Sequence, residues 1–436
     1  DREFEDFSQE FQLNYESNAL KAVMGYYYLD SDSDITSSGP DGGTTQTVRL
    51  RGWATQFKDT YVDDRELESQ SVYANVDWNI NEQWQLSLGG RYTRDEREEQ
   101  QEADVVQDIY AQAVAPPELA FLGQFGLGVA VRPGLEAVVE NSPGFQGWVT
   151  PFTRGFVLET EEPIDVDDDW SEFSPSARLT WFAGDDVMFY AGYSSGFKSG
   201  GFNRQSGNPT PFDPETVDTY TLGAKSTWLD GALRLNGEIF FNDYQDKQLA
   251  TIGLVGGDLT QITDNVGELE TSGVEVELTW LPAVDGLLVG FNVGYLDSDV
   301  KEFLEETEGG TVDISDDTAM GFAPEWTVQA RVNYDFDIGS AGSLMVGTDV
   351  SYRTDSYTAL TVDTSSPSAD AQVQEEHAIW NAIAAWRSPN LNWRVALEGK
   401  NLTDERVKVN SFSIGPIVTT GWNLPRTWAV TVGYEF

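Results

Sequence analysis

Apolar and polar residues alternate along segment after segment of this chain, and this period of two limits the fold more than any other feature. At the end of the chain, Trp428, Val430, Val432, Tyr434 and Phe436 alternate with small or polar residues. Side chains on a β-strand point to opposite faces in turn, so this pattern predicts a strand with one apolar and one polar face. Because the same pattern recurs along the chain, the protein is predicted to be all-β.

The alternation predicts fifteen strands, joined by connections that are short and long in turn. Short turns at one end of a sheet and long loops at the other are typical of antiparallel transmembrane β-barrels, whose short turns face the periplasm. The longest predicted loop, residues 96–170, is accordingly expected to be extracellular. The predicted strands cover residues 7–15, 20–29, 66–80, 84–95, 171–183, 187–198, 215–228, 232–244, 265–281, 286–299, 323–338, 342–357, 375–388, 391–402 and 425–436.

The two faces of the predicted strands differ in a way that favours a membrane. The polar faces mix small residues with charged ones such as Arg331 and Glu398. The apolar faces carry Trp and Tyr near strand ends, including Trp78, Trp228 and Tyr434. Aromatic residues at both rims of an outward apolar band form the girdle of a transmembrane barrel. In the alternative, a soluble β-sandwich adhesin or lectin, the rings would lie at the centre of the strands and fill the core.

The charge balance limits the possible partners and chemistry. The chain has 26 basic and 73 acidic side chains and a net charge of −47, which argues against nucleic acid as a partner because a phosphate backbone needs a basic surface. Cysteine is absent and His377 is the only histidine, so disulfides, thiolate metal sites and most imidazole-dependent catalysis are excluded. No nucleophile–base pair is recognisable. We therefore expect no enzyme, no cofactor and no structural metal.

Most acidic clusters lie in the predicted long loops, so the negative charge is expected to surround the extracellular end. One of them, Asp165-Val-Asp-Asp-Asp169, offers alternating carboxylates that could bind calcium, an ion that prefers hard oxygen ligands. The segment lacks the glycine and the distal glutamate of an EF-hand loop. A solvated acidic loop is the favoured interpretation.

The odd number of strands indicates that these residues form part of a larger barrel. Bacterial single-chain barrels have an even number of strands and both termini on the periplasmic side. Here the last strand runs to the periplasm, so fifteen strands place the first residue in an extracellular loop. Strands 7–15 and 425–436 then run in the same direction, and pairing between them would be a parallel seam in an antiparallel barrel. We expect both to be unpaired edges within residues 1–436.

Short motifs follow one another along nearly the whole chain. The most specific is Phe189-Tyr-Ala-Gly-Tyr-Ser-Ser-Gly-Phe-Lys-Ser-Gly-Gly-Phe-Asn203. The others are Phe7–Leu13, Gly89–Arg94, Pro214-Glu215 with Tyr220–Lys225, Asn265–Leu278, Lys400–Glu405 and Pro425–Phe436. In this order and at these separations, they resemble the motifs of the TonB-dependent outer-membrane receptors.

The resemblance implies a 22-stranded barrel with a plugged lumen. Residues 1–436 would be strands 8 to 22, the C-terminal portion of that barrel, and neither a plug domain nor a TonB box appears in them. The implied function is energised uptake across the bacterial outer membrane. A scarce ligand binds at the extracellular mouth, and TonB acts through the absent plug segment to release it inward. A ferric siderophore is the first expectation for the ligand, ahead of a corrinoid or an oligosaccharide; a passive porin-like channel is the alternative.

Two further partners follow from the resemblance. Phe436 ends an alternating segment in the manner of the signal that the outer-membrane assembly machinery recognises in this family, and it would also complete the aromatic girdle. Lipid and lipopolysaccharide are the expected surroundings of the apolar band. Even-numbered positions 428–436 should face this lipid, and odd-numbered positions 427–435 should face the lumen.

The candidate ligand contacts lie in loops 199–214 and 403–424 and, for Phe197, at the end of the strand before the first of them. Aromatic residues and a few polar groups that face a cavity are what a small-ligand site needs. The candidates are Phe197, Phe202, Asn203, Arg204 and Trp422. The glycine pair at 200–201 fits a structural turn as well as a vestibule lining. Charged residues on the polar faces are expected to pair with carboxylates of the barrel and plug more than with ligand, because buried charges need partners; they are Arg91, Arg178, Lys225, Arg331 and Arg394.

Overall fold

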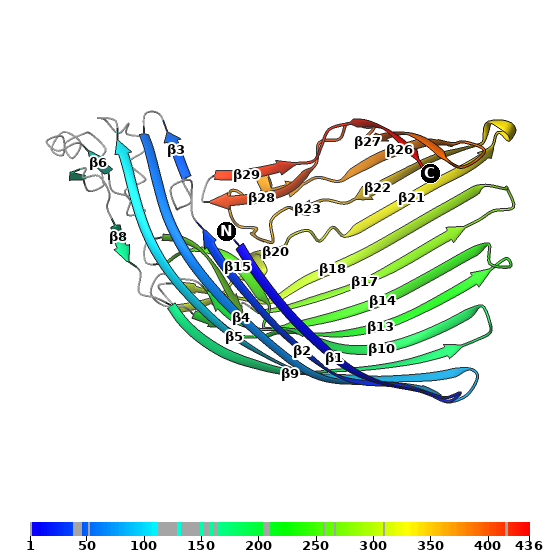
Figure 1. The fold of residues 1–436 in the computed structure, drawn as a ribbon, viewed down its shortest axis with the longest axis horizontal. Helices are drawn as coiled ribbons and strands as arrows, with labels where there is room; N and C mark the ends of the chain where they lie inside the picture. The colour runs from blue at the N-terminus through cyan, green and yellow to red at the C-terminus, as the bar shows by residue number, and fades with distance from the viewer. Residues whose placement is uncertain are drawn as a thin grey trace.

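Long antiparallel strands lie side by side in one curved wall (Figure 1). The computed structural model describes residues 2–37, 46–50, 53–111, 129–131, 149–151, 157–160, 164–203, 210–255, 258–265, 267–307, 310–414 and 417–436 of the 436-residue chain. None of the helical segments in those ranges is long and apolar enough to cross a membrane.

Within the described residues, the wall consists of the fifteen strands that the alternation predicts. Each pairs antiparallel with the next along the wall, and the turns predicted to be short are short. They are β1 (Arg2–Glu16), β2 (Leu20–Ser37), β4 (Trp53–Asn79), β5 (Trp84–Ala111), β9 (Ile164–Phe182), β10 (Val187–Lys198), β13 (Glu215–Trp228), β14 (Leu233–Gln245), β17 (Gly267–Trp280), β18 (Leu287–Thr307), β21 (Trp326–Asp337), β22 (Ser343–Arg353), β26 (His377–Arg387), β27 (Trp393–Lys400) and β30 (Thr427–Tyr434).

The long connections contain short strands of their own. They are β3 (Gln46–Leu50), β6 (Val129–Val131), β7 (Val149–Pro151), β8 (Val157–Thr160), β11 (Gly201–Asn203), β12 (Thr210–Phe212), β15 (Gln248–Val255), β16 (Asp258–Asn265), β19 (Gly310–Asp313), β20 (Thr318–Met320), β23 (Ser356–Tyr357), β24 (Thr361–Asp363), β25 (Val373–Gln374), β28 (Lys408–Ile414) and β29 (Ile417–Trp422). Three pairs of them form hairpins, β11–β12, β15–β16 and β28–β29, and β3, β8 and β19 pair with wall strands. The remaining pairs are β6–β7, which is parallel, β20–β24 and β23–β25.

The wall is not closed between its first and last strands. In the part of the chain that the structure describes, β1 pairs only with β2, and β30 pairs only with β27. The prediction of two unpaired edges is therefore confirmed. Each edge presents a row of backbone N–H and C=O groups, and such groups cost several kcal/mol apiece if they face hydrocarbon.

The register of the ladder places the apolar and polar faces where the sequence predicts them. Val430 lies opposite Leu397, and the neighbouring Thr431 lies opposite Ala396, so the even positions of β30 share a face with the apolar residues of β27. Outward-facing rings mark the rims of the apolar band and remain exposed. They include Trp78, Trp181, Trp228, Trp280, Trp326, Trp393 and Tyr434.

The ladder extends well beyond this band on one side of the wall, and here the predicted boundaries of the strands are too short. β5 was expected to end near residue 95, but it runs to Ala111 and still pairs with β9 at Gln101 and Ile164. The acidic segments expected in loops therefore stand on strands. Hydrogen bonding between neighbouring strands continues above the membrane, because charged side chains on a strand can point into water.

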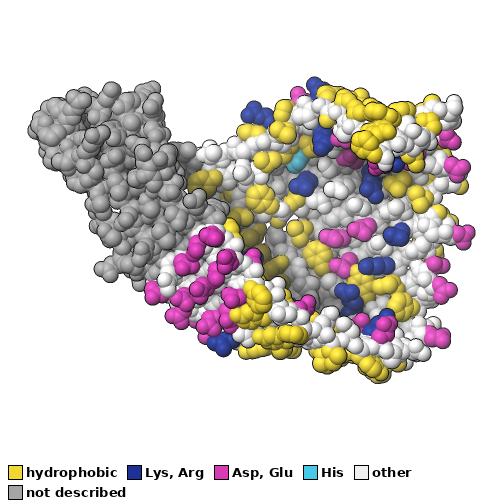
Figure 2. All heavy atoms as spheres, viewed as in Figure 1, with side chains coloured by type: hydrophobic (Ala, Val, Ile, Leu, Met, Phe, Trp, Pro, Cys, Tyr) yellow, Lys and Arg dark blue, Asp and Glu magenta, His cyan; other side chains and the backbone are white. Residues whose placement is uncertain are grey.

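Alternation places most of these carboxylates on one side of the extension. Rows of opposed residues on β1, β2, β4, β5 and β9 share the face that carries the outward rings lower down. Figure 2 shows acidic side chains gathered on this part of the wall. We call this surface the acidic face; it consists of Glu3, Glu5, Asp30, Asp32, Asp34, Asp64, Glu66, Glu68, Glu96, Glu98, Asp165, Asp167 and Asp169.

Repulsion within the acidic face is only partly relieved. The Arg94 guanidinium lies 3.2 Å from Asp169 and 3.8 Å from Glu96. Partial burial, and then the charge of Asp34, raise the pKa of Asp64. The pKa of Glu66 is raised by partial burial and by the charge of Asp32. The acidic face therefore carries a high density of like charge, and ionisation of Asp64 and Glu66 destabilises the folded state.

Several large side chains of the wall lie over a glycine on the adjacent strand. Tyr190 covers Gly223 so closely that a Cβ at position 223 would lie 2.3 Å from its ring. Tyr73 covers Gly25 and Trp428 covers Gly399 in the same way. A glycine in a strand allows this close approach, and the covering side chain replaces the packing that the glycine lacks.

Candidate functional site

The glycine pair at 200–201 lies against the inner face of the β5–β9 extension. A Cβ on Gly200 would lie 2.4 Å from the Trp170 indole, and one on Gly201 would lie 3.2 Å from a terminal nitrogen of Arg97. Trp170 is 7% exposed. The pair therefore has a structural role, because only glycine lets this backbone pass so close to a buried ring and a guanidinium.

Phe202 and Asn203 lie at this place but have different roles. The Phe202 ring packs at 5.8 Å, centroid to centroid, against Trp170. The Asn203 amide donates to the Thr263 carbonyl at 2.5 Å, and its oxygen accepts from the Thr263 N–H at 2.6 Å. Asn203 is buried and thus ties strand β11 to strand β16. Its expected role in ligand binding therefore competes with this structural role.

Other polar side chains strengthen the tie between the two hairpins β11–β12 and β15–β16. The Asn265 amide donates to the Asp213 carbonyl at 2.8 Å and accepts from the Asp213 N–H at 2.6 Å. The Gln248 amide donates to the Asp213 and Ser199 carbonyls. Nearby, Lys247 forms a 2.6 Å ion pair with the buried Glu215. The hairpins are therefore held together by side-chain to backbone bonds.

Phe197, the candidate near the end of β10, does not belong to this group. Phe197 lies on β10, on the same side as Phe189, whose ring stacks on the outward Trp181. Alternation along β10, which runs to Lys198 as predicted, therefore turns Phe197 outward, and its role in ligand binding stays a prediction. Arg204 lies outside the described residues.

Trp422 belongs to a separate cluster at the ends of β28 and β29. The Arg406 guanidinium stacks over its ring at 4.1 Å from the centroid, a cation–π contact. A cavity of about 440 Å³ lies beside the pair. The Lys408 ammonium donates to the Ala371 and Val373 carbonyls at 3.0 and 2.6 Å, which holds the neighbouring segment in place.

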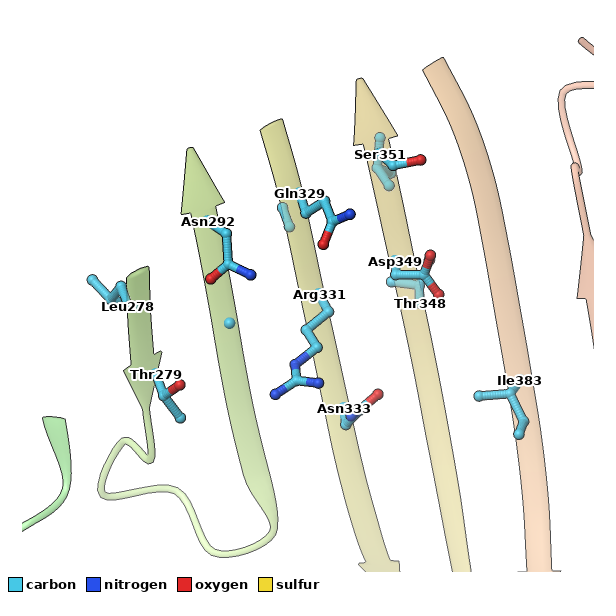
Figure 3. Close-up of a pocket in the computed structure, with 13 residues that line it drawn as sticks. Leu278, Thr279, Asn292, Gln329, Arg331, Asn333, Thr348, Asp349, Ser351 and Ile383 are labelled. Carbon is cyan, nitrogen blue, oxygen red and sulfur yellow. The ribbon is translucent and has the colours of Figure 1, made fainter. Parts of the chain in front are cut away.

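The inner face of the wall holds a second cavity, of about 500 Å³, between β17 and β26. Figure 3 shows polar side chains from adjacent strands around it, among them Asn292, Gln329, Asn333 and Ser351. Arg331 extends across Gly290, whose missing side chain leaves room for the guanidinium. These groups fit a hydrated passage better than an apolar ligand pocket.

Two of the lumen cations lie over one tyrosine on β10. The Tyr190 hydroxyl donates to Glu238 at 2.5 Å. Arg178 lies over the ring at 5.1 Å from its centroid, and Lys225 lies at 5.9 Å. The sequence predicts carboxylates as partners of the lumen cations, and here Arg178 and Lys225 lie over an aromatic ring whose hydroxyl binds a carboxylate.

The carboxylates of residues 165–169 do not converge on one point. Asp165, Asp167 and Asp169 belong to the acidic face, whereas Asp168 points to the inner face opposite Arg97. Across the described ranges, no group of three or more His, Cys, Asp or Glu side chains has a geometry that could hold a metal ion.

The comparisons with known proteins agree with this architecture. The β-barrel model of the TonB-dependent receptor-like family matches residues 2–402. The chain belongs to this family. The ferric-pyoverdine M114 receptor PbuA of Pseudomonas sp. (strain M114) is 25% identical over 235 residues, which are 54% of this chain and 26% of that protein.

Solved structures show the same fold. The ferric yersiniabactin uptake receptor FyuA from Yersinia pestis has a TM-score of 0.69 at 16% identity, with 100% of this chain and 54% of that chain covered. The siderophore receptor PiuA from Acinetobacter baumannii has a TM-score of 0.61 at 15% identity, with 100% and 65% covered. The chain thus spans about half the length of the first of these receptors. Members of this family are outer-membrane proteins and transport receptors, which places the chain in the outer membrane.

Proposed function

We propose that this chain forms part of a receptor for the TonB-dependent uptake of a ferric siderophore. The family match carries the proposal, because it covers most of the chain and because the curated relative is named a ferric-pyoverdine receptor. The site supports it with two aromatic–guanidinium clusters, Trp170–Phe202 beside Arg97 and Trp422 with Arg406, above an inner wall lined by polar groups.

The proposed mechanism divides the work between the barrel and a plug. The clusters on the extracellular hairpins would bind the ferric complex, and the polar inner wall would allow its passage once TonB had moved the plug. We propose that residues 1–436 are strands 8 to 22 of a 22-stranded barrel, so that further strands pair with β1 and β30. The catalytic chemistry of an enzyme has no part in this mechanism.

The experiment is iron uptake by cells that carry the complete receptor and lack their other siderophore receptors. A panel of ⁵⁵Fe siderophores is supplied with and without a protonophore. We expect uptake that stops when the proton gradient collapses, because TonB draws on that gradient. A combined Phe202→Ala and Trp422→Ala variant should reduce uptake about tenfold or more, on the scale of losing two aromatic contacts. Phe189→Ala is the matched control, because its ring lies on the lipid side.

The same experiment distinguishes the alternatives. A passive porin-like channel would admit the complexes in proportion to concentration and would ignore the protonophore. A receptor for a corrinoid or an oligosaccharide would show energised uptake of those ligands and none of any ferric complex. Either result would remove the ferric-siderophore proposal.

Two further partners belong to the proposal. The Phe436 ring packs edge-on against the Tyr434 ring, with 4.9 Å between the ring centroids, and remains fully exposed. Its side chain is therefore available to the assembly machinery. The outward apolar band is the proposed contact with lipid and lipopolysaccharide. Deleting Phe436 should lower the amount of receptor in the outer membrane without changing the uptake per assembled receptor.

A further inference from the structure

The inner face of the β5–β9 extension differs in character from the acidic face behind it. On β5, Glu96 and Glu98 point outward, and alternation turns Asp95 and Arg97 inward. Trp170 lies directly opposite Asp95 on β9. The inner surface therefore combines Arg97, Asp95 and a large ring, and a second carboxylate, Asp168, lies opposite Arg97 on β9.

Strand β11 closes this group from the other side. Phe202 packs on Trp170, and the backbone at Gly200 and Gly201 lies against Trp170 and Arg97. Ser199 precedes the glycine pair. The result is an aromatic platform with polar groups at its edge, built from three segments that are far apart in the sequence.

Three polar atoms of this group are buried without a hydrogen-bond partner in the ranges that the structure describes. They are Arg97 Nε, Asp95 Oδ1 and Ser199 Oγ. Leaving a buried donor or acceptor unsatisfied is unfavourable, so such atoms mark places where a partner is expected. The unsatisfied set contains a donor and a charged acceptor side by side.

This combination selects among ligand groups. A catecholate or carboxylate presents only acceptors, so it would meet Arg97 favourably but would place its charge against Asp95. An amide or a hydroxyl presents a donor and an acceptor together, and it can satisfy both residues. The acidic face adds a field that repels polyanions approaching the mouth. Burial, and after it the charges of Asp34 and Asp32, raise the pKa values of Asp64 and Glu66 on this face.

We infer that Asp95, Arg97 and Ser199, on the Trp170–Phe202 platform, form a subsite for a neutral amide or hydroxyl group of the ferric ligand. The substrate class is then a neutral or cationic ferric complex with a peptide or hydroxamate framework, and not a trianionic tris-catecholate. This inference rests on the proposed uptake function and specifies the ligand of the same vestibule.

The test uses the complete receptor in outer-membrane vesicles and two ⁵⁵Fe probes of opposite kind. Ferrichrome is a neutral cyclic-peptide trihydroxamate complex, and ferric enterobactin is a trianionic tris-catecholate. We expect ferrichrome to bind at least tenfold more tightly than ferric enterobactin. Arg97→Ala should weaken ferrichrome binding about tenfold, whereas Arg94→Ala, the matched loss of charge on the outward face of β5, should change it less than twofold.

A variant that binds a probe more tightly cannot owe this result to poor folding, so one such variant is included. Asp95→Asn keeps the shape of the side chain, removes its charge and supplies a donor, so it should strengthen ferric enterobactin binding about tenfold. Glu96→Gln removes the same charge from the acidic face and should leave that affinity within twofold. The subsite is refuted if the unmodified receptor prefers ferric enterobactin, or if Asp95→Asn and Glu96→Gln have equal effects.

Energised uptake by the cells of the uptake experiment described above separates this inference from the proposed function. If uptake of a ferric complex requires the proton gradient but is indifferent to ligand charge and to position 97, the uptake function stands and the subsite falls. If neither probe nor any other ferric complex is taken up in an energised manner, both fall together.

Discussion

On each strand of the wall, adjacent residues face different solvents, and this difference dominates the effect of a substitution. Val430 faces the lipid side and Thr431 the inner side of β30. Val430→Arg should destabilise the inserted barrel by about 2–4 kcal/mol, the cost of an arginine near the middle of the bilayer. Thr431→Arg should cost much less, because the inner face already holds arginines. Refolding into lipid bilayers at increasing urea concentrations measures both. Equal losses at the two positions would contradict the assigned faces.

The contact between Tyr190 and Gly223 allows a double-mutant test. Gly223→Ala places a methyl group into the Tyr190 ring and should destabilise the barrel by about 1–3 kcal/mol through overpacking. In a Tyr190→Ala background the ring is absent, so the same glycine substitution should be nearly neutral. Urea unfolding of the four proteins gives the coupling. A glycine substitution that costs the same in both backgrounds would show that the ring moves aside freely.

The site residues divide into those that the sequence could supply and those that it could not. Phe202 and Trp422 were found because each lies in a long loop and each is aromatic, and both occur in clusters with a guanidinium nearby. Trp170 and Arg97 were missed because they belong to a segment predicted as loop. Had the alternation been followed to residue 170, Trp170 would have been recognised as an aromatic residue on the inner, mainly polar face of β9.

Among the elements, strand ends inside the membrane were predictable and strand ends outside it were not. The apolar face of a strand vanishes where the bilayer ends, and with it the period-two signal of hydrophobicity. Backbone pairing does not need that signal, so β4, β5 and β9 continue into water with charged residues on both faces. Runs of acidic residues are usual in loops, and for this reason the predicted end of β5, near residue 95, is too early.

Protonation should stabilise the outer part of the β4–β5 hairpin. The folded state raises the pKa of Asp64 above 3.8 and that of Glu66 above 4.5, so it binds protons more tightly than the unfolded chain does. The penalty on the charged forms, from burial and from like charge, is fully present above the folded pKa values and is relieved as the pH falls through them toward the ordinary values. Hydrogen-exchange protection factors of residues 64–68 should therefore rise as the pH is lowered from 7 toward these ordinary values. Protection of β22 serves as the control and should not change.

The tie between the two extracellular hairpins can be loosened at one residue. Asn203→Ala removes two hydrogen bonds to Thr263 and leaves that backbone N–H and C=O without their partners. The expected local cost is about 1–3 kcal/mol. Hydrogen exchange in β15 and β16 should accelerate, and the wall strands should keep their protection. Asn236→Ala is the control, because its amide makes only one long, 3.4 Å bond on the exposed inner wall. Unaltered exchange in β16 would show that the Gln248 and Asn265 bonds hold the hairpins alone.

For the whole molecule, the order of the strands follows from the sequence because a barrel meander pairs neighbours along the chain. Each strand carries its own signal, and the short turns leave no choice of partner. The spatial relation of the long loops has no such local rule. The bonds between loop 199–214 and the β15–β16 hairpin depend on single amides such as Asn203 and Asn265, and the sequence does not indicate which backbone groups these amides bind.

If residues 1–436 are expressed alone, the two edges of the wall should be the strands least protected from hydrogen exchange. Half of the amides of β1 and of β30 have no ladder partner on their outer side in the described structure. Those amides should exchange much faster than the amides of β14, which is paired on both sides. Hydrogen exchange of the polypeptide in detergent micelles measures this. Slow exchange along both edges would mean that the two strands find a partner in each other or in a second copy.

The glycines covered by large side chains limit which substitutions can accumulate during evolution. Gly25 and Tyr73, Gly223 and Tyr190, and Gly399 and Trp428 each form a matched pair on adjacent strands. A larger residue can replace the glycine only after the ring has been lost, and a ring without its glycine has nowhere to lie. Substitution at one partner should therefore be permitted only along with substitution at the other. Homologous barrels aligned on this chain should show these positions changing together, as correlated pairs that record which strands are neighbours.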